Sequence, residues 1–193
     1  MRIVAGRHRG RHLLAPPGET VRPTSDRARE ALFNILSHGK LAADGVPFAD
    51  AAVLDAFAGT GALGLEALSR GAAAAVFIER HQEVLAILRK NIAALGEDTR
   101  ARVLPGDATR PPRAHSDCAV AFLDPPYRSG LAAPASAALA AAGWLAPDAL
   151  AVVELAAREH FVPPQGFALI DERVYGAARL VFLRYAQTTG GER

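Results

Sequence analysis

The chain of 193 residues contains little of several residue types that mark particular classes of protein. Its single cysteine excludes a disulfide framework and a zinc site built from several thiolates. No run of about 18 apolar residues occurs, so no membrane-spanning helix is predicted. Residues 1–14 contain no long apolar stretch, so we expect no secretory signal, no membrane partner and a cytoplasmic location. Charged residues make up 22% of the chain, an ordinary globular share that excludes intrinsic disorder.

Lysine is also scarce, because the chain has only 2 lysines beside 20 arginines. The first 30 residues contain seven arginines and three acids, a net charge of +4, whereas the remainder has a net charge of −2. A basic segment on a mildly acidic body is typical of contact with a polyanion such as nucleic acid. An arginine-rich composition with solvated side chains explains the same numbers.

The order of predicted elements indicates one α/β domain over residues 21–186. Apolar stretches around Gly6 and Gly10 predict a small β-hairpin in a basic extension over residues 1–20. A helix capped by Thr24 or Ser25 follows. Strands are then predicted at 52–56, 74–78, 101–104, 118–123, 149–155, 168–174 and 179–185, helices at 62–69, 81–95 and 131–142, and a frayed tail at 187–193.

This alternation predicts a seven-stranded mixed sheet with parallel βαβ units, helices on both faces and an antiparallel last pair of strands. Ligands of such sheets bind beyond the carboxyl ends of the strands. Candidate functional residues are therefore sought where each predicted strand ends.

The first predicted strand ends in a glycine-rich turn. Gly59, Gly61 and Gly64 fit the pattern G-x-G-x-x-G, and Glu79 ends the next strand 20 residues beyond Gly59. This spacing matches the dinucleotide fingerprint, in which the acid binds ribose hydroxyls. Asp55 argues against a dinucleotide, because a carboxylate beside the turn would repel a pyrophosphate. The ammonium group of S-adenosylmethionine would instead be attracted.

The stretch from Asp55 through Phe57 to Gly61 resembles motif I of class I S-adenosylmethionine-dependent methyltransferases. The resemblance implies that Glu79 holds the ribose. It also implies that Asp107, with Ala108 after it, contacts the adenine. A turn aspartate is the alternative interpretation of Asp107.

The sharpest feature is Asp124-Pro125-Pro126-Tyr127, which ends the apolar run of the fourth strand. Two prolines stop a strand because neither donates a ladder hydrogen bond. Asp124 and the Pro125 carbonyl are then fixed acceptors for a planar amino group, and Tyr127 offers a ring for stacking. The four residues resemble motif IV of methyltransferases that act on exocyclic amines: adenine N6, guanine N2 or a glutamine side-chain amide.

Other chemistries fit less well. Methylation of cytosine C5 needs a cysteine nucleophile, and Cys118 lies in a predicted buried strand. His8 and His12 are spaced four apart but lie among arginines, so no metal site is predicted.

Together with the motifs above, the front end of the chain closely resembles the bacterial 16S rRNA guanine-N2 methyltransferases of the RsmD type. The resemblance rests on Met1-Arg2-Ile3-Val4-Ala5-Gly6, Arg9-Gly10-Arg11 and the segment 22–36. It implies a Rossmann-like fold and transfer of methyl from S-adenosylmethionine to one guanine N2 in assembling small subunits. It further implies that Arg7, Arg9, Arg11 and Arg22 contact RNA and that Thr24 and Arg27 contact the cofactor.

A monomeric enzyme is expected. The alternatives left open are a DNA adenine-N6 methyltransferase, an NAD-dependent oxidoreductase that uses the glycine turn, and an RNA-binding protein without catalytic activity.

Overall fold

The computed structural model describes residues 1–16, 23–38, 40–42 and 47–186, with only the backbone for residues 23–27. Its helices are α1 (Pro23–His38), α2 (Ala62–Ser69), α3 (Gln82–Leu95) and α4 (Ala132–Ala141), with a short 3-10 turn η1 (Lys40–Ala42). Its strands are β1 (Ala52–Asp55), β2 (Ala74–Glu79), β3 (Ala101–Pro105), β4 (Cys118–Leu123), β5 (Leu145–Ala156), β6 (Phe167–Tyr175) and β7 (Ala178–Tyr185). Helix α1 begins at Pro23, a favoured residue at a first helical position, rather than after Thr24 or Ser25.

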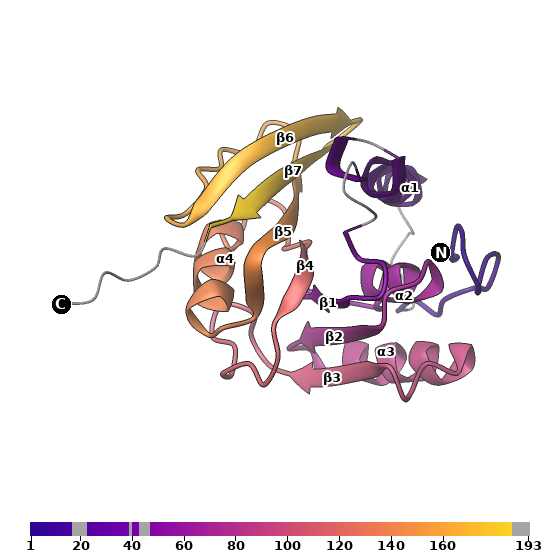
Figure 1. Cartoon of the computed structure of the whole chain (residues 1–193). Coiled ribbons are helices and arrows are strands. Elements are labelled where there is room, and N and C mark those ends of the chain that lie inside the picture. The colour runs from indigo at the N-terminus through magenta and orange to yellow at the C-terminus, as the bar shows by residue number, and fades with distance from the viewer. Residues whose placement is uncertain (17–22, 39, 43–46, 187–193) are drawn as a thin grey trace.

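The strands form one sheet in the order β3-β2-β1-β4-β5-β7-β6 (Figure 1). Strands β1 to β5 run parallel, and β7 pairs antiparallel with both β5 and β6. The predicted seven-stranded mixed α/β sheet is confirmed. The carboxyl ends of the five parallel strands therefore meet at one edge of the sheet.

Strand β5 is longer than predicted. The expected strand began at residue 149, after Pro147, whereas β5 begins at Leu145. The β4–β5 register shifts between Cys118 and Val120, and Asp148 has a φ of 60°. This bulge accommodates the proline, because residues within a bulge do not take part in the regular ladder.

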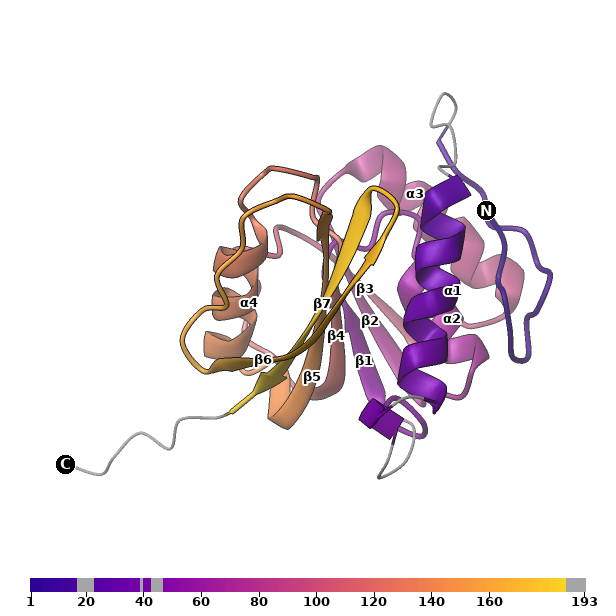
Figure 2. The same ribbon diagram turned by 90° about the horizontal axis from the view of Figure 1, so that it is seen from above.

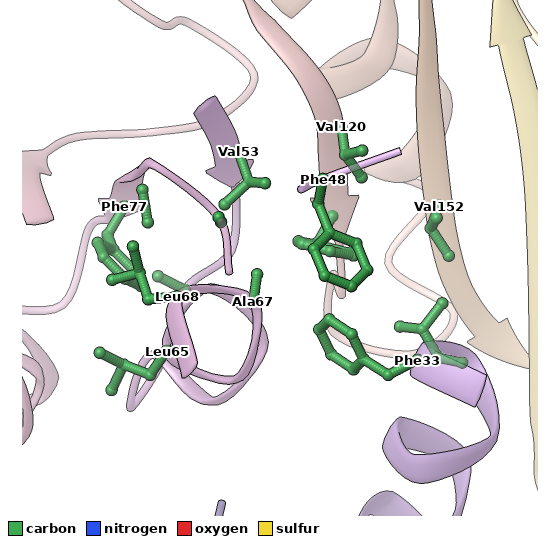
Figure 3. Packing of buried hydrophobic residues seen from close by; sticks show 14 of the residues in the cluster. Phe33, Phe48, Val53, Leu65, Ala67, Leu68, Phe77, Val120 and Val152 are labelled. Carbon is green, nitrogen blue, oxygen red and sulfur yellow. The ribbon is translucent and has the colours of Figure 1, made fainter. Parts of the chain in front are cut away.

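The sheet separates two hydrophobic layers. Helices α1, α2 and α3 lie on one face and α4 on the other (Figure 2). The first layer packs Phe33 of α1 against Phe48, with ring centroids 5.6 Å apart (Figure 3). Phe33 also packs against Phe122 of β4 at the same centroid distance. The second layer includes Trp144, whose indole N–H donates to the Pro112 carbonyl. Helices thus cover both faces, as predicted.

The predicted N-terminal hairpin forms with little strand pairing: the Ile3 and Leu13 N–H groups donate to the Arg11 and Met1 carbonyls at 2.9 and 3.1 Å. Residues 1–14 fold back on themselves, but Arg2 and His12 form only an isolated antiparallel bridge. The N–H groups of Val4 and Ala5 donate to the carboxylate of Glu66 on α2, at 2.8 and 3.0 Å, instead of across a ladder. The segment is therefore a loop attached to α2 and α3, which lie beside it in Figures 1 and 2.

Glu66 is fully buried and balanced by arginines. Arg70 donates to it at 2.6 Å, and Arg29 lies 4.0 Å away. Arg29 of α1 is only 4% exposed and donates to the Arg2 carbonyl. A buried carboxylate needs such partners, so the basic residues of this region partly serve the fold.

Candidate active site

A cavity of about 930 Å³ lies at the carboxyl ends of the parallel strands. This volume falls in the range of about 300–1,000 Å³ that ligand pockets occupy. Residues of the glycine turn, the strand-end acids and the Asp-Pro-Pro-Tyr motif line it. The lining includes Asp55, Phe57, Gly59, Glu79, Asp107 and Ala108 on one side, and Asp124, Pro125, Pro126, Tyr127 and Glu154 on the other.

The glycine turn shapes one wall of the cavity. Gly61 does not line the cavity; it is the left-handed N-cap of α2, with a φ of 86°, and a Cβ there would lie 2.4 Å from Leu88. A Cβ on Gly64 would lie 2.4 Å from the ring of Phe77 on β2. The two glycines therefore bring α2 against its neighbours, while Gly59 faces the cavity.

Asp55 lies at the tip of β1 and is 1% exposed. Its Oδ2 accepts a hydrogen bond of 2.9 Å from the Gly64 N–H in the first turn of α2. Burial raises the pKa of Asp55 to about 7, and the nearby Glu79 charge adds to the rise, while the Gly64 bond opposes it. A cationic group in the cavity would favour the ionised form.

Glu79 joins β2 to the glycine turn. Its Oε2 accepts from the Gly59 N–H at 2.9 Å, and its Oε1 accepts from the His81 N–H at 2.8 Å. Asp107, after β3, accepts from the N–H and the hydroxyl of Thr109, both at 2.8 Å. The Thr109 backbone bond is the main reason that the pKa of Asp107 is lowered, with the hydroxyl bond second. All three strand-end acids are thus fixed by hydrogen bonds from backbone N–H groups.

The second half of the cavity follows β4. Asp124 is exposed, Pro125 is buried and Tyr127 is half-buried. The Tyr127 hydroxyl donates a 2.8 Å hydrogen bond to Oε1 of Glu154 on β5. Glu154 belongs to none of the predicted motifs, and its position after the apolar run of β5 is the signal in the sequence that could have found it.

Sequence reasoning also missed a wall built from the N-terminus. Met1, Ala15 and Pro16 line the cavity. The buried Asn91 of α3 accepts from the Leu14 N–H at 2.8 Å and donates to the Leu14 and Thr60 carbonyls at 3.1 and 2.9 Å. Nothing local in the sequence marks this contact, because Asn91 lies 77 residues beyond Leu14.

Arg7, Arg9 and Arg11 are exposed on the N-terminal loop. Arg11 also donates to the Ala94 carbonyl at 2.5 Å, near the end of α3. Between them on the loop, His8 is buried and contacts Glu97 at 2.5 Å. Arg22 lies outside the described residues, as do the side chains of Thr24 and Arg27.

Two negative findings concern the described residues alone. Within them, no group of three or more His, Cys, Asp or Glu side chains could hold a metal ion. No helix among them is long and apolar enough to cross a membrane. Cys118 is buried, and burial raises the pKa of its thiol to about 12, so it stays protonated as a core residue.

The sheet order, the antiparallel last pair and the glycine turn after β1 define the fold of a class I methyltransferase. The chain belongs to the family described as conserved hypothetical protein 95, whose model matches residues 1–184. It is 39% identical to ribosomal RNA small subunit methyltransferase D of Escherichia coli K12, over all of this chain and 92% of that protein. The predicted RsmD-type resemblance is confirmed.

Two further relatives agree. The Haemophilus influenzae protein named ribosomal RNA small subunit methyltransferase D is 36% identical, over 91% of this chain and 89% of that protein. The solved structure of yhhF from Escherichia coli superposes with a TM-score of 0.80 at 38% identity, covering 96% of this chain and 98% of that chain.

Proposed function

We propose that the protein transfers a methyl group from S-adenosylmethionine to the exocyclic N2 of a guanine in the 16S rRNA of the small ribosomal subunit. The observation that carries the proposal is that one cavity joins the glycine turn and its three acids to Asp124-Pro125-Pro126-Tyr127. The names of the relatives support ribosomal RNA of the small subunit as the substrate.

The donor set of the first half fits S-adenosylmethionine better than a dinucleotide. Asp55, Glu79 and Asp107 place three carboxylates around this half, where a pyrophosphate would be repelled. Glu79 would hold the ribose, Asp107 and Ala108 the adenine, and Asp55 the ammonium group. Phe57 and Gly59 line the same half of the cavity and would contact the cofactor there. When bound, S-adenosylmethionine supplies a methyl group on a cationic sulfur.

The second half fits a planar amine. The carboxylate of Asp124 and the carbonyl of Pro125 would accept the two N–H bonds of guanine N2, and Tyr127 would stack on the base. Pro125 and Pro126 stiffen the backbone, so that the acceptors need little reorganisation. The nitrogen lone pair would form the new N–C bond as the C–S bond to the methyl group breaks, which leaves a neutral thioether, and the proton that nitrogen loses would pass to Asp124 or to water.

The basic loop would hold the RNA. A guanine N2 inside a helix cannot be approached in line, so the base must lie in a loop or be flipped out. Arg7, Arg9, Arg11 and Arg22 would contact phosphates and fix the position of the RNA without reading its sequence. Thr24 and Arg27 of the α1 end would cover the cofactor. A substrate within an assembling subunit would place the enzyme in the cytoplasm, where we propose that it acts as a monomer.

Transfer of labelled methyl tests the proposal. Small subunits from a strain that lacks the protein should gain label as N2-methylguanine at one position, located by mass spectrometry of rRNA fragments. Duplex DNA should gain none. Label on adenine of DNA would favour the adenine-N6 alternative. Nicotinamide binding without S-adenosylmethionine binding, measured by calorimetry, would favour an oxidoreductase, and RNA affinity without transfer would favour a binding protein.

A further inference from the structure

We infer that Glu154 selects guanine, by accepting the N1–H of the target base while Asp124 and the Pro125 carbonyl hold its amine. The inference rests on the proposed function, because it presumes that guanine N2 is the methyl acceptor. It assigns base selectivity to a residue outside the Asp-Pro-Pro-Tyr motif.

The sheet register places the two acids side by side. Strands β4 and β5 are parallel, and Leu123 pairs with Val153, so Asp124 and Glu154 are the next residues on adjacent strands. Neighbouring strands lie about 4.8 Å apart. Both residues line the cavity. Two acceptor-rich side chains thus face one ligand from adjacent positions.

The direction of the Glu154 carboxylate is set by Tyr127, the residue proposed to stack on the base. The Tyr127 hydroxyl donates to Oε1 of Glu154 over 2.8 Å. A carboxylate tied to the stacking ring lies near the edge of a base stacked on that ring. Glu154 is half-buried, and a hydrogen bond to an ionised acceptor is stronger where water is partly excluded.

The acceptors match one edge of one purine. Guanine presents N1–H and the N2 amine next to each other, both as donors. Adenine presents its N6 amine beside an N1 that has no hydrogen and accepts. A carboxylate facing N1 therefore attracts guanine and repels adenine, and a well-paired base edge discriminates by roughly 10- to 100-fold.

A simpler role for Glu154 is to hold Tyr127 in place. Under that role, Tyr127→Phe, which deletes only the donor to Glu154, would disturb activity as much as Glu154→Gln. Under direct recognition the two variants differ. Glu154→Gln keeps size and an acceptor for the tyrosine hydroxyl, but its amide also donates a hydrogen bond.

The test uses 2-aminopurine, which keeps the 2-amino group but has an accepting N1 without hydrogen. Small subunits are assembled with rRNA ligated to carry guanine or 2-aminopurine at the mapped target. The ratio of kcat/KM for the two bases is measured for the wild type, Glu154→Gln and Tyr127→Phe. S-adenosylmethionine affinity and Tm are measured as controls for folding.

The wild type should prefer guanine by at least about 10-fold, and Glu154→Gln should bring the ratio near one. Tyr127→Phe should lower the ratio by less than Glu154→Gln does, because the carboxylate loses its contact with the tyrosine hydroxyl but can still accept N1–H. An unchanged ratio in Glu154→Gln, or an equal change in both variants, would overturn the inference while leaving guanine methylation intact. If the wild-type enzyme forms no N2-methylguanine on unmodified subunits, the proposed function itself is contradicted. That result does not depend on the ratio of the two bases.

Discussion

The two halves of the cavity are built differently. In the half after β1, β2 and β3, the carboxylates of Asp55, Glu79 and Asp107 each accept hydrogen bonds from backbone N–H groups within the chain. In the half after β4 and β5, Asp124 is exposed, and Tyr127 and Glu154 are joined through their side chains.

The difference indicates that the first half of the cavity serves the cofactor and the second half serves the base. Carboxylates fixed by backbone donors give a rigid surface whose shape exists before any ligand binds, which suits a cofactor that returns at every turnover. An exposed carboxylate beside two stiff prolines can form new hydrogen bonds to an incoming base. Changes in the first half should therefore alter cofactor affinity, and changes in the second half should alter the transfer rate.

The largest expected effect is that of Asp124→Ala. Loss of the carboxylate leaves the amine poorly oriented, and misplacement of this kind costs about 100-fold or more in rate. Turnover at saturating cofactor should fall accordingly, while calorimetry should give the wild-type Kd for S-adenosylmethionine. Asp117→Ala, at the exposed opposite end of β4, is the matched control and should have wild-type turnover.

Glu79→Gln should produce the next largest effect, on affinity. The glutamine amide can accept a hydrogen bond from only one of the Gly59 and His81 N–H groups, because it presents its own N–H to the other. A buried donor left without an acceptor costs about 1–3 kcal/mol. We expect S-adenosylmethionine to bind about 10- to 30-fold more weakly. The free energy of unfolding, measured with urea, should fall as well. Glu83→Gln, exposed in the first turn of α3, should change neither quantity by a comparable amount.

Outside both halves, reversal of charge at Arg7 and Arg9 should weaken substrate binding without changing cofactor affinity. Each arginine that neutralises a phosphate contributes about one unit to the salt slope. The double change to glutamate should lower affinity for small subunits about 10-fold and flatten its dependence on salt. Arg113→Glu serves as the control, because Arg113 is exposed in the loop before β4. Unchanged binding by the double variant would contradict a role for the loop.

The smallest effect concerns pH and Asp55. Its pKa is raised from 3.8 to about 7 in the folded protein, so the folded state holds a proton that the unfolded state has released. The stabilising contribution of this group is therefore fully present below about pH 4 and is lost as the pH rises through about 7. Asp55→Asn should unfold with a flatter dependence on pH between 5 and 8 in urea titrations.

The same carboxyl should make cofactor binding depend on pH. Ionised Asp55 attracts an ammonium group, so S-adenosylmethionine should bind about five-fold more tightly at pH 8 than at pH 6. Asp55→Asn should bind weakly at both values. A wild-type Kd that is constant over this interval would contradict contact between Asp55 and the ammonium group.

The sequence predicted local structure best where the signals were local. Helix α2 begins at Ala62 and ends at Ser69 as expected, because a glycine turn precedes it and Gly71 follows. The strand-end acids meet in one cavity because parallel strands end at one edge of a sheet, which follows from topology alone.

Predictions were incomplete where a residue distant in the sequence accepts a backbone hydrogen bond or sets the register of a strand. Glu66 accepts the amides of Val4 and Ala5, so the expected hairpin reduces to one bridge. The bulge that keeps Pro147 within β5 depends on pairing with β4. Glu154 has no motif around it, and only the register of β5 against β4 places it beside Asp124. Such contacts depend on the three-dimensional arrangement, which sequence spacing does not show.

The different roles of the two halves are tested most directly by measuring cofactor affinity and transfer rate for one variant from each half. The Kd for S-adenosylmethionine and the single-turnover rate of methyl transfer at saturating cofactor are measured for Glu79→Gln and Asp124→Ala in parallel with the wild type. We predict a weaker Kd with a near wild-type rate for Glu79→Gln, and a wild-type Kd with a rate lowered about 100-fold for Asp124→Ala. Wild-type single-turnover transfer by Asp124→Ala, or equal losses of affinity and rate in both variants, would contradict these different roles.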